Sequence, residues 1–198
     1  MAELIQAVEK SIYLNLIYED RYLFLIKGFG MTIYLTIMTF LLGTIIGALF
    51  CALRFSKNHR VSNSVVWLKT LFIRLPTLVL LIIFAYLLFA DTNIDTVLLA
   101  IFAFSLKTGS YISDIMYSAI GTVSKGEIEA GRTLGMSKIT VFRLVVLPQA
   151  VKNALPVYRN QLILTMQDTS LVGFLAINDL TRASQIITSR TMDPYISI

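Results

Sequence analysis

Charged side chains at three positions, Lys107, Asp114 and Asp168, interrupt long apolar stretches of this 198-residue chain. If those stretches cross a membrane, the charges are costly there, and such groups usually line a water-filled cavity or pair between helices. The hydroxyls of Thr169 and Ser170 directly follow Asp168 and add neutral hydrogen-bonding groups. Two roles are therefore open to these residues: lining a path for a small polar solute, or hydrogen bonding between helices.

The composition shows independently that the chain is a membrane protein. Hydrophobic residues make up 56% of the sequence and charged residues 15%, with a mean hydropathy of +0.74. Soluble domains carry about 25% charged residues, and the smaller share found here cannot cover a water-exposed surface. The net charge of +5 could suggest nucleic acid, but the basic residues lie between apolar spans, as in positively charged cytoplasmic loops. We therefore expect one membrane domain in a lipid bilayer and no nucleic-acid partner.

The sequence offers little for catalysis. It has no GxxxxGK[ST] phosphate loop, so any use of ATP would require another subunit. His59 is the only histidine, which leaves no metal-ligand cluster and nearly excludes a Ser/His/Asp set. Cys51 is the only cysteine and can form no disulfide within the chain. We therefore expect a protein that is not an enzyme, with no metal and no cofactor.

Apolar stretches predict four membrane spans. Residues 28–53 contain no charge and exceed the ~20 residues that a span needs. Further spans are expected at about residues 64–90, 96–123 and 154–178. Residues 1–27 begin with acidic rather than basic residues, unlike a signal peptide, so they predict a retained N-terminal interfacial helix.

Two glycines in the first span, Gly43 and Gly47, form a GxxxG pattern. In membrane helices this pattern lets two helix backbones approach closely. It also arises by chance, since glycine is more frequent in membrane helices than in soluble ones. The sequence alone leaves both interpretations open.

The loops between the spans predict the orientation of the chain. Residues 54–60 contain basic residues and no acidic one, and residues 124–152 contain more basic than acidic residues. The loop near Asp91 and Asp95 contains neither Lys nor Arg. Because basic loops stay in the cytoplasm, we expect residues 54–60 and 124–152 inside and the N-terminus outside.

Residues 124–152 predict two short helices at the membrane surface. Gly135 is placed to end the first helix, since glycine takes the left-handed conformation at no steric cost. Ser137 can cap the second helix by accepting a backbone N–H. Pro148 lacks a backbone donor and is expected to turn the chain. The segment is therefore expected to be a bent, amphipathic helical hairpin.

The same loop carries a family resemblance. Glu129-Ala130-Gly131 is followed after three residues by Gly135 and after nine more by Val145, with Leu147-Pro148 close behind. This spacing resembles the EAA loop of bacterial ABC importer permeases, where alanine is usual in place of Gly131 and isoleucine in place of Val145. Further matches resemble the polar amino-acid branch, the histidine/glutamine/arginine permeases, over roughly residues 25–182; they lie at residues 109–111, 114, 147–150, 154–156, 160–161 and 168–171.

The resemblance implies an all-α, polytopic membrane protein with about four to five transmembrane helices and an ABC type I importer-like fold. Residues 1–198 would form one transmembrane permease domain, multi-pass in a bacterial plasma (inner) membrane. The implied partners are two copies of an ATP-binding subunit, a second permease subunit of the same or a related chain, and an extracellular or periplasmic amino-acid-binding protein. The family usually continues with one further span, so the chain is expected to be truncated or to lack that helix.

The residues and the resemblance together assign two sets of site residues. In the family the position of Lys107 is more often uncharged, and the position of Gln167 is often lysine. Arg74 would lie near the path or extend its side chain to the headgroups. The expected substrate path comprises Arg74, Thr108, Tyr111, Asp114, Asp168, Thr169 and Ser170. The expected ATPase-coupling residues are Glu129, Ala130, Gly131, Gly135, Leu147 and Pro148.

The alternative function is a standalone secondary transporter or channel for small polar solutes. It would need an ion-coupling site and inverted repeats, and the two halves of the sequence show no such repeat. A membrane scaffold without transport activity is disfavoured by Lys107, Asp114 and Asp168 within the spans. Co-purification with an ATPase would separate an ABC importer subunit from both other classes.

Overall fold

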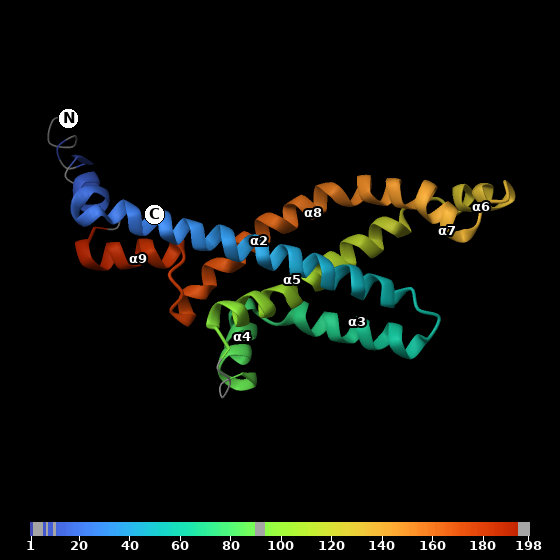
Figure 1. Ribbon diagram of the computed structural model, residues 1–198, viewed down its shortest axis with the longest axis horizontal. Helices are drawn as coiled ribbons and strands as arrows, with labels where there is room; N and C mark the ends of the chain where they lie inside the picture. The colour runs from blue at the N-terminus through green and yellow to red at the C-terminus, as the bar shows by residue number, and fades with distance from the viewer. Residues whose placement is uncertain (2–5, 7, 10, 90–93, 194–198) are drawn as a thin grey trace.

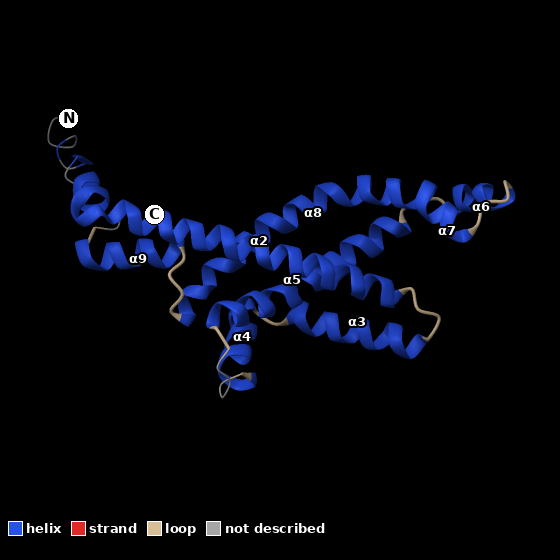
Figure 2. Cartoon of the chain, in the orientation of Figure 1, coloured by secondary structure: helices blue, strands red, loops and turns tan. Residues whose placement is uncertain are grey.

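The computed structural model describes residues 1, 6, 8–9, 11–89 and 94–193, and within them every regular element is a helix (Figures 1 and 2). Two described helical runs are long and apolar enough to cross a membrane, Tyr13–Arg54 and α5, Thr96–Gly121. The first run includes α2, Arg21–Arg54, of 34 residues. At 1.5 Å per residue α2 is about 51 Å long, so it extends beyond a hydrocarbon core of ~30 Å.

The expected second span is broken rather than continuous. α3, His59–Arg74, meets the run of α4, Thr77–Ile82, and η3, Ile83–Leu88, at an angle of 106°. Pro76 lacks a backbone donor and disfavours helical conformation in the residue before it, and Leu75 is accordingly extended. The two arms together are apolar enough for one span, and the break leaves carbonyls without helical partners at the end of α3.

The second half of the chain consists of a projecting loop and a long helix. The elements are α6, Lys125–Thr133; α7, Lys138–Val141; η4, Phe142–Val146; α8, Leu147–Thr169; η5, Ser170–Leu175; and α9, Leu180–Thr191. α8 packs on α5, and α9 lies beside the N-terminal part of α2 (Figure 1). The expected fourth span, residues 154–178, is thus divided between α8, the 3-10 turn η5 and a short non-helical segment.

The N-terminal segment, expected as one interfacial helix over residues 1–27, is divided into short pieces. η1 covers Tyr13–Ile17, η2 covers Tyr18–Asp20, and α2 then begins. Glu19 and Asp20 have φ angles of 57° and 52°, a left-handed conformation that separates η1 from α2. Residues 2–5, 7 and 10 lie outside the described residues, and the interfacial location of the segment stays a prediction.

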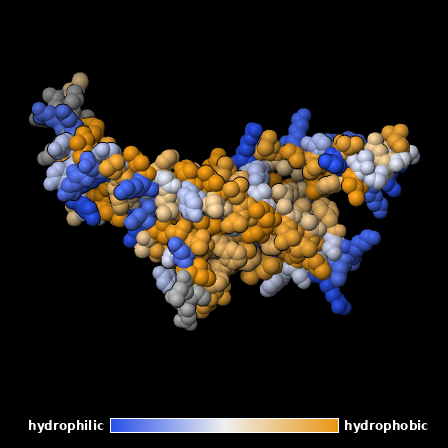
Figure 3. Space-filling model, viewed as in Figure 1, coloured by the Kyte–Doolittle hydropathy of each residue, from blue (hydrophilic) through white to orange (hydrophobic). Residues whose placement is uncertain are grey.

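α2 and α5 pack closely at the centre of the molecule through their glycines. A Cβ atom added to Gly47 would lie 2.8 Å from the carbonyl oxygen of Gly109, and one added to Gly109 would lie 2.8 Å from that of Gly43. The GxxxG pattern is therefore a packing surface within the chain. Around this crossing, apolar residues cover the middle of the molecule and hydrophilic ones gather toward its two ends (Figure 3), as expected for a body that crosses a bilayer.

Candidate functional site

Three helices meet at a polar bridge formed by Lys107, Thr77 and Asp168. The ammonium of Lys107, on α5, donates to the hydroxyl of Thr77 and, at 3.2 Å, to the carbonyl of Leu75. The Thr77 hydroxyl, on α4, donates to the carboxylate of Asp168, on α8, at 3.1 Å. Lys107 and Thr77 are only 8% and 9% exposed, and Asp168 is half-buried. A cation and an anion are thus linked through one hydroxyl inside an apolar body.

The break at Pro76 explains why the bridge forms at this position. The last carbonyls of a helix have no partner within it, and a cation near a helix C-terminus is favoured by the helix dipole. Lys107 satisfies one such carbonyl, that of Leu75. Sequence reasoning did not find Thr77, and it left Lys107 out of the path because the family resemblance implied no role for it. The sequence signal that could have identified Thr77 is its position directly after Pro76, a proline that breaks the helix.

The other hydroxyls of the expected path make short-range or interhelical bonds. The Thr108 hydroxyl lies 3.3 Å from that of Thr165, which links α5 to α8. Thr169 and Ser170 each donate to a backbone carbonyl three residues back in the chain. The structure thus brings Thr108 and Asp168 onto the facing helices α5 and α8. Of the other expected path residues, Tyr111 lies half-buried on α5, and Arg74 lies exposed at the end of α3.

Asp114 lies in a separate cluster that joins α2, α3 and α5. Its carboxylate accepts from Arg54 at 2.7 Å and from Lys69 at 2.7 Å at each oxygen. The Arg54 guanidinium also lies 3.7 Å from the ring centroid of Tyr117, within cation–π range. Lys107 and Asp114 lie seven residues apart on α5, which is about two helical turns, yet their side chains contact different helices. The role of Asp114 in a substrate path stays a prediction, and its observed contacts are interhelical ion pairs.

Replacing Asp114 by asparagine is expected to destabilise the fold by about 2 kcal/mol, since it leaves Arg54 and the buried Lys69 without a carboxylate. The loss stays below that of a fully buried pair because the Asp114 side chain is 41% exposed. Thermal unfolding in detergent measures the effect. Combining Asp114→Asn with Lys69→Met should cost less than the sum of the single changes. Additive costs would show that this ion pair contributes nothing to stability.

The helical loop of residues 124–152 has the caps that the sequence predicted. Gly135 has a φ of +82°, and its N–H donates to the carbonyl of Arg132 at 3.1 Å. The hydroxyl of Ser137 accepts from the backbone N–H of Thr140 at 3.1 Å and so caps α7. Gly131 is buried because α6 packs on α7: an added Cβ would lie 3.0 Å from a methyl of Val141. Gly131 therefore sets the close contact between the two helices.

The remaining residues that we expected to couple to an ATPase lie on the surface of this loop, with one difference from expectation. Glu129, Ala130 and Leu147 are exposed. Pro148 does not turn the chain: it lies in the first turn of α8, and the helix continues from α7 through the π turn η4 into α8. Pro148 lacks a backbone N–H for the ladder of this continuous helix, and the wider π turn η4 directly precedes it. The expected hairpin is bent at Gly135 alone.

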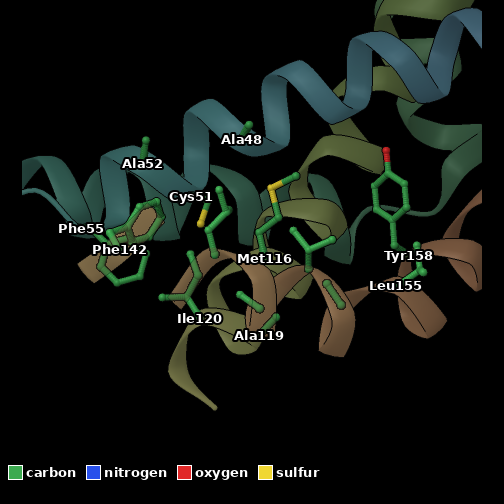
Figure 4. A pocket seen from close by; sticks show the side chains of 14 residues that line it. Ala48, Cys51, Ala52, Phe55, Met116, Ala119, Ile120, Phe142, Leu155 and Tyr158 are labelled. Carbon is green, nitrogen blue, oxygen red and sulfur yellow. The ribbon is translucent and has the colours of Figure 1, made fainter. Parts of the chain in front are cut away.

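An apolar pocket of about 440 Å³ lies between α2, α5 and α8, next to η4 (Figure 4). Cys51 and Met116 point into it from α2 and α5, and Phe142 closes the end nearest the loop. At the other end of the pocket, the hydroxyl of Tyr158 lies 2.7 Å from the hydroxyl of Thr44. This lining offers no charged partner for a polar solute. Phe142 and Leu147, at the base of the helical loop, line this pocket together with residues of both central helices.

These features define a class: an all-helical membrane protein with charged groups bridged inside its apolar body and a helical loop that projects from one end. The chain belongs to the family of binding-protein-dependent transport system inner membrane components, whose sequence profile matches residues 40–197. The resemblance to polar amino-acid ABC permeases and the all-α, type I importer-like fold are thereby confirmed.

Three curated relatives illustrate the similarity. An L-cystine transport system permease protein of Bacillus subtilis is 36% identical over 86% of this chain and 74% of its own length. A histidine/lysine/arginine/ornithine transport system permease protein of Salmonella typhimurium is 32% identical over 98% and 85%. A putative glutamine transport system permease protein of Rickettsia prowazekii is 29% identical over 90% and 83%. Two of these names specify amino acids without net charge, glutamine and cystine, and the third includes the cationic lysine, arginine and ornithine.

Solved structures of ABC transporters share the fold. A chain from the crystal structure of an amino acid ABC transporter with histidines superposes with a TM-score of 0.80 at 29% identity, covering 87% of this chain and 83% of that one. The MetNI methionine ABC transporter, in an inward-facing conformation, gives 0.74 at 18% identity, covering 90% and 87%. At that lower identity the likeness concerns the fold alone.

Proposed function

We propose that this chain is the membrane subunit of an ATP-driven amino-acid importer, in which it forms part of the substrate path and couples to a separate ATPase by alternating access. The observation that carries the proposal is the bridge of Lys107, Thr77 and Asp168, which places opposite charges between three helices. Family membership and the names of the relatives support the amino-acid substrate.

The path is proposed to run past the bridge. An amino acid carries a carboxylate and an ammonium, so its site needs both donors and acceptors. Asp168 would accept from the ammonium, because a half-buried carboxylate gains from a cation that desolvates with it. The other residues proposed to line the path are Arg74, Thr108, Tyr111, Asp114, Thr169 and Ser170.

The projecting loop is proposed as the docking site of the ATPase. Its end of the molecule also carries the basic loop of residues 54–60 (Figure 1), and both would lie in the cytoplasm by the positive-inside rule. Glu129, Ala130 and Leu147 face outward there, while Gly131 and Gly135 hold α6 against α7. A rigid loop of this kind could pass a motion of the ATPase to α8, with which it is continuous.

The complete transporter would contain two such membrane subunits, either two copies of this chain or this chain with a relative. Two ATPase subunits would dock on the two loops, and an extracellular or periplasmic binding protein would deliver the amino acid. The assembly would lie in a bacterial inner membrane, with this chain crossing it several times. No ATP site is assigned to this chain, since its sequence has no phosphate loop.

Asp168→Asn is expected to lower ATP-dependent amino-acid uptake into reconstituted vesicles at least tenfold. The change removes a charge-assisted hydrogen bond, worth about 1.5–3 kcal/mol, and tenfold corresponds to about 1.4 kcal/mol. Asp95→Asn is the matched control, because Asp95 caps α5 by accepting from the N–H of Val97 and asparagine caps equally well. Normal uptake and substrate preference in Asp168→Asn, at normal expression, would remove Asp168 from the path.

A further inference from the structure

Lys107 is the residue of the bridge that the family resemblance left without a role. Lys107 is 8% exposed, and its ammonium contacts two uncharged acceptors among the described residues, the carbonyl of Leu75 and the hydroxyl of Thr77. A buried cation held only by neutral groups is costly and gains from an anion. The nearest anion in this bond chain is Asp168, on the far side of the Thr77 hydroxyl.

The hydrogen bonds of the bridge run in one direction, from ammonium to hydroxyl to carboxylate. The two ends of the bridge carry the charges opposite to those of an amino acid. The substrate carboxylate can pair with the Lys107 ammonium, and the substrate ammonium can pair with the Asp168 carboxylate. Binding in this way would insert the substrate between the two charges and replace the contacts that Thr77 makes with both. Each charged group of the protein would then gain an oppositely charged partner.

The remaining charges decide which side chains such a substrate can carry. Asp114 and Asp168 are the only acidic residues of α4, α5 and α8. Asp114 is held by two cations, Arg54 and Lys69. With Asp168 occupied by the substrate ammonium, no acid of these helices remains to pair with a cationic side chain, which would be left buried without a partner.

From this arrangement we infer that Lys107 determines specificity: it binds the carboxylate of the substrate and restricts this permease to amino acids with neutral or acidic side chains. The inference rests on the proposed function and deepens it, since relatives of similar identity are named for glutamine, for cystine and for histidine, lysine, arginine and ornithine. Their similar identities do not indicate a substrate class for this chain, so the inference rests on the charge of the buried Lys107, which Thr77 links to Asp168.

Equilibrium binding tests the inference on the complex of permease and ATPase in nanodiscs, without the binding protein, so that only the membrane path selects the ligand. The probes are radiolabelled glutamine, glutamate and arginine. The unmodified complex should bind glutamine or glutamate at least tenfold more tightly than arginine. Lys107→Gln should lower that preference at least tenfold, and Lys107→Arg should keep it. Lys27→Gln, an equal loss of charge at an exposed site of α2, should change nothing.

Arginine binding as tight as that of glutamine in the unmodified complex would overturn the inference, whether or not any variant folds. An unchanged preference in a folded Lys107→Gln complex would overturn it as well, because a merely structural lysine does not alter a ratio of ligand affinities. ATP-dependent uptake into closed vesicles that contain the same complex, with the binding protein added, tests the proposed function separately. Uptake together with nanodisc binding that shows no charge preference would refute only the role of Lys107, whereas failure of all three amino acids to bind and to be taken up would refute both.

Discussion

Gly135→Val is expected to abolish substrate-stimulated ATP hydrolysis by the reconstituted transporter while the protein still inserts in the membrane. Gly135 lies between α6 and α7 with a φ of +82°, and no atom lies within 4 Å of the place its Cβ would take. The obstacle is therefore the backbone: a left-handed conformation costs most residues roughly 1–2 kcal/mol, and a β-branched residue resists it more strongly. The loop would change its bend and lose the shape that the ATPase contacts.

Two variants separate backbone strain from other effects in that experiment. Gly135→Asn should remain coupled, since asparagine adopts the left-handed region far more readily than valine. Ala130→Trp keeps the bend but adds bulk at an exposed position of α6, and it should prevent co-purification of the ATPase. If Gly135→Val and Ala130→Trp both hydrolysed ATP at the stimulated rate, the loop would be an ordinary connector and the proposed coupling would be wrong.

Gly47→Leu is expected to have the largest effect on stability. A Cβ atom there would lie 2.8 Å from the carbonyl oxygen of Gly109 and 2.8 Å from a methyl of Ile112. Real side chains do not approach a backbone that closely, so α2 and α5 would have to separate. Overpacking typically costs about 1–3 kcal/mol and occasionally more, and the upper end applies here because a rigid backbone provides the contact.

The control is the same substitution at Gly30, on the same helix. Gly30 is exposed, and nothing lies within 4 Å of the Cβ position, so Gly30→Leu should leave the thermal midpoint in detergent within a few degrees of the unmodified protein. Gly47→Leu should lower the midpoint sharply and reduce the yield of monodisperse protein. Equal midpoints for the two variants would mean that the α2–α5 contact adjusts at no cost.

The sequence by itself determined the features that depend on neighbouring residues. The charge-free run of residues 28–53 lies within the helical run Tyr13–Arg54, which is long and apolar enough to cross a membrane, because hydropathy summed over one helix needs no partner. Gly135 and Ser137 cap their helices as expected, since a cap involves residues at most five apart. The spacing around Glu129 and Gly135 also led to the family, because it lies within one loop.

Tertiary structure alone decided how distant residues pair. Asp114 meets Arg54 and Lys69, which lie 60 and 45 residues away, and Asp168 meets Thr77 across 91 residues. Such pairs depend on where helices cross and on the 106° break at Pro76, and neither the crossing nor the angle is encoded in local periodicity. Lys107 and Asp114 are about two turns apart on α5, yet they contact different helices. Lys107 contacts α4, whereas Asp114 contacts α2 and α3. The polar bridge therefore became visible only once α4, α5 and α8 were placed together.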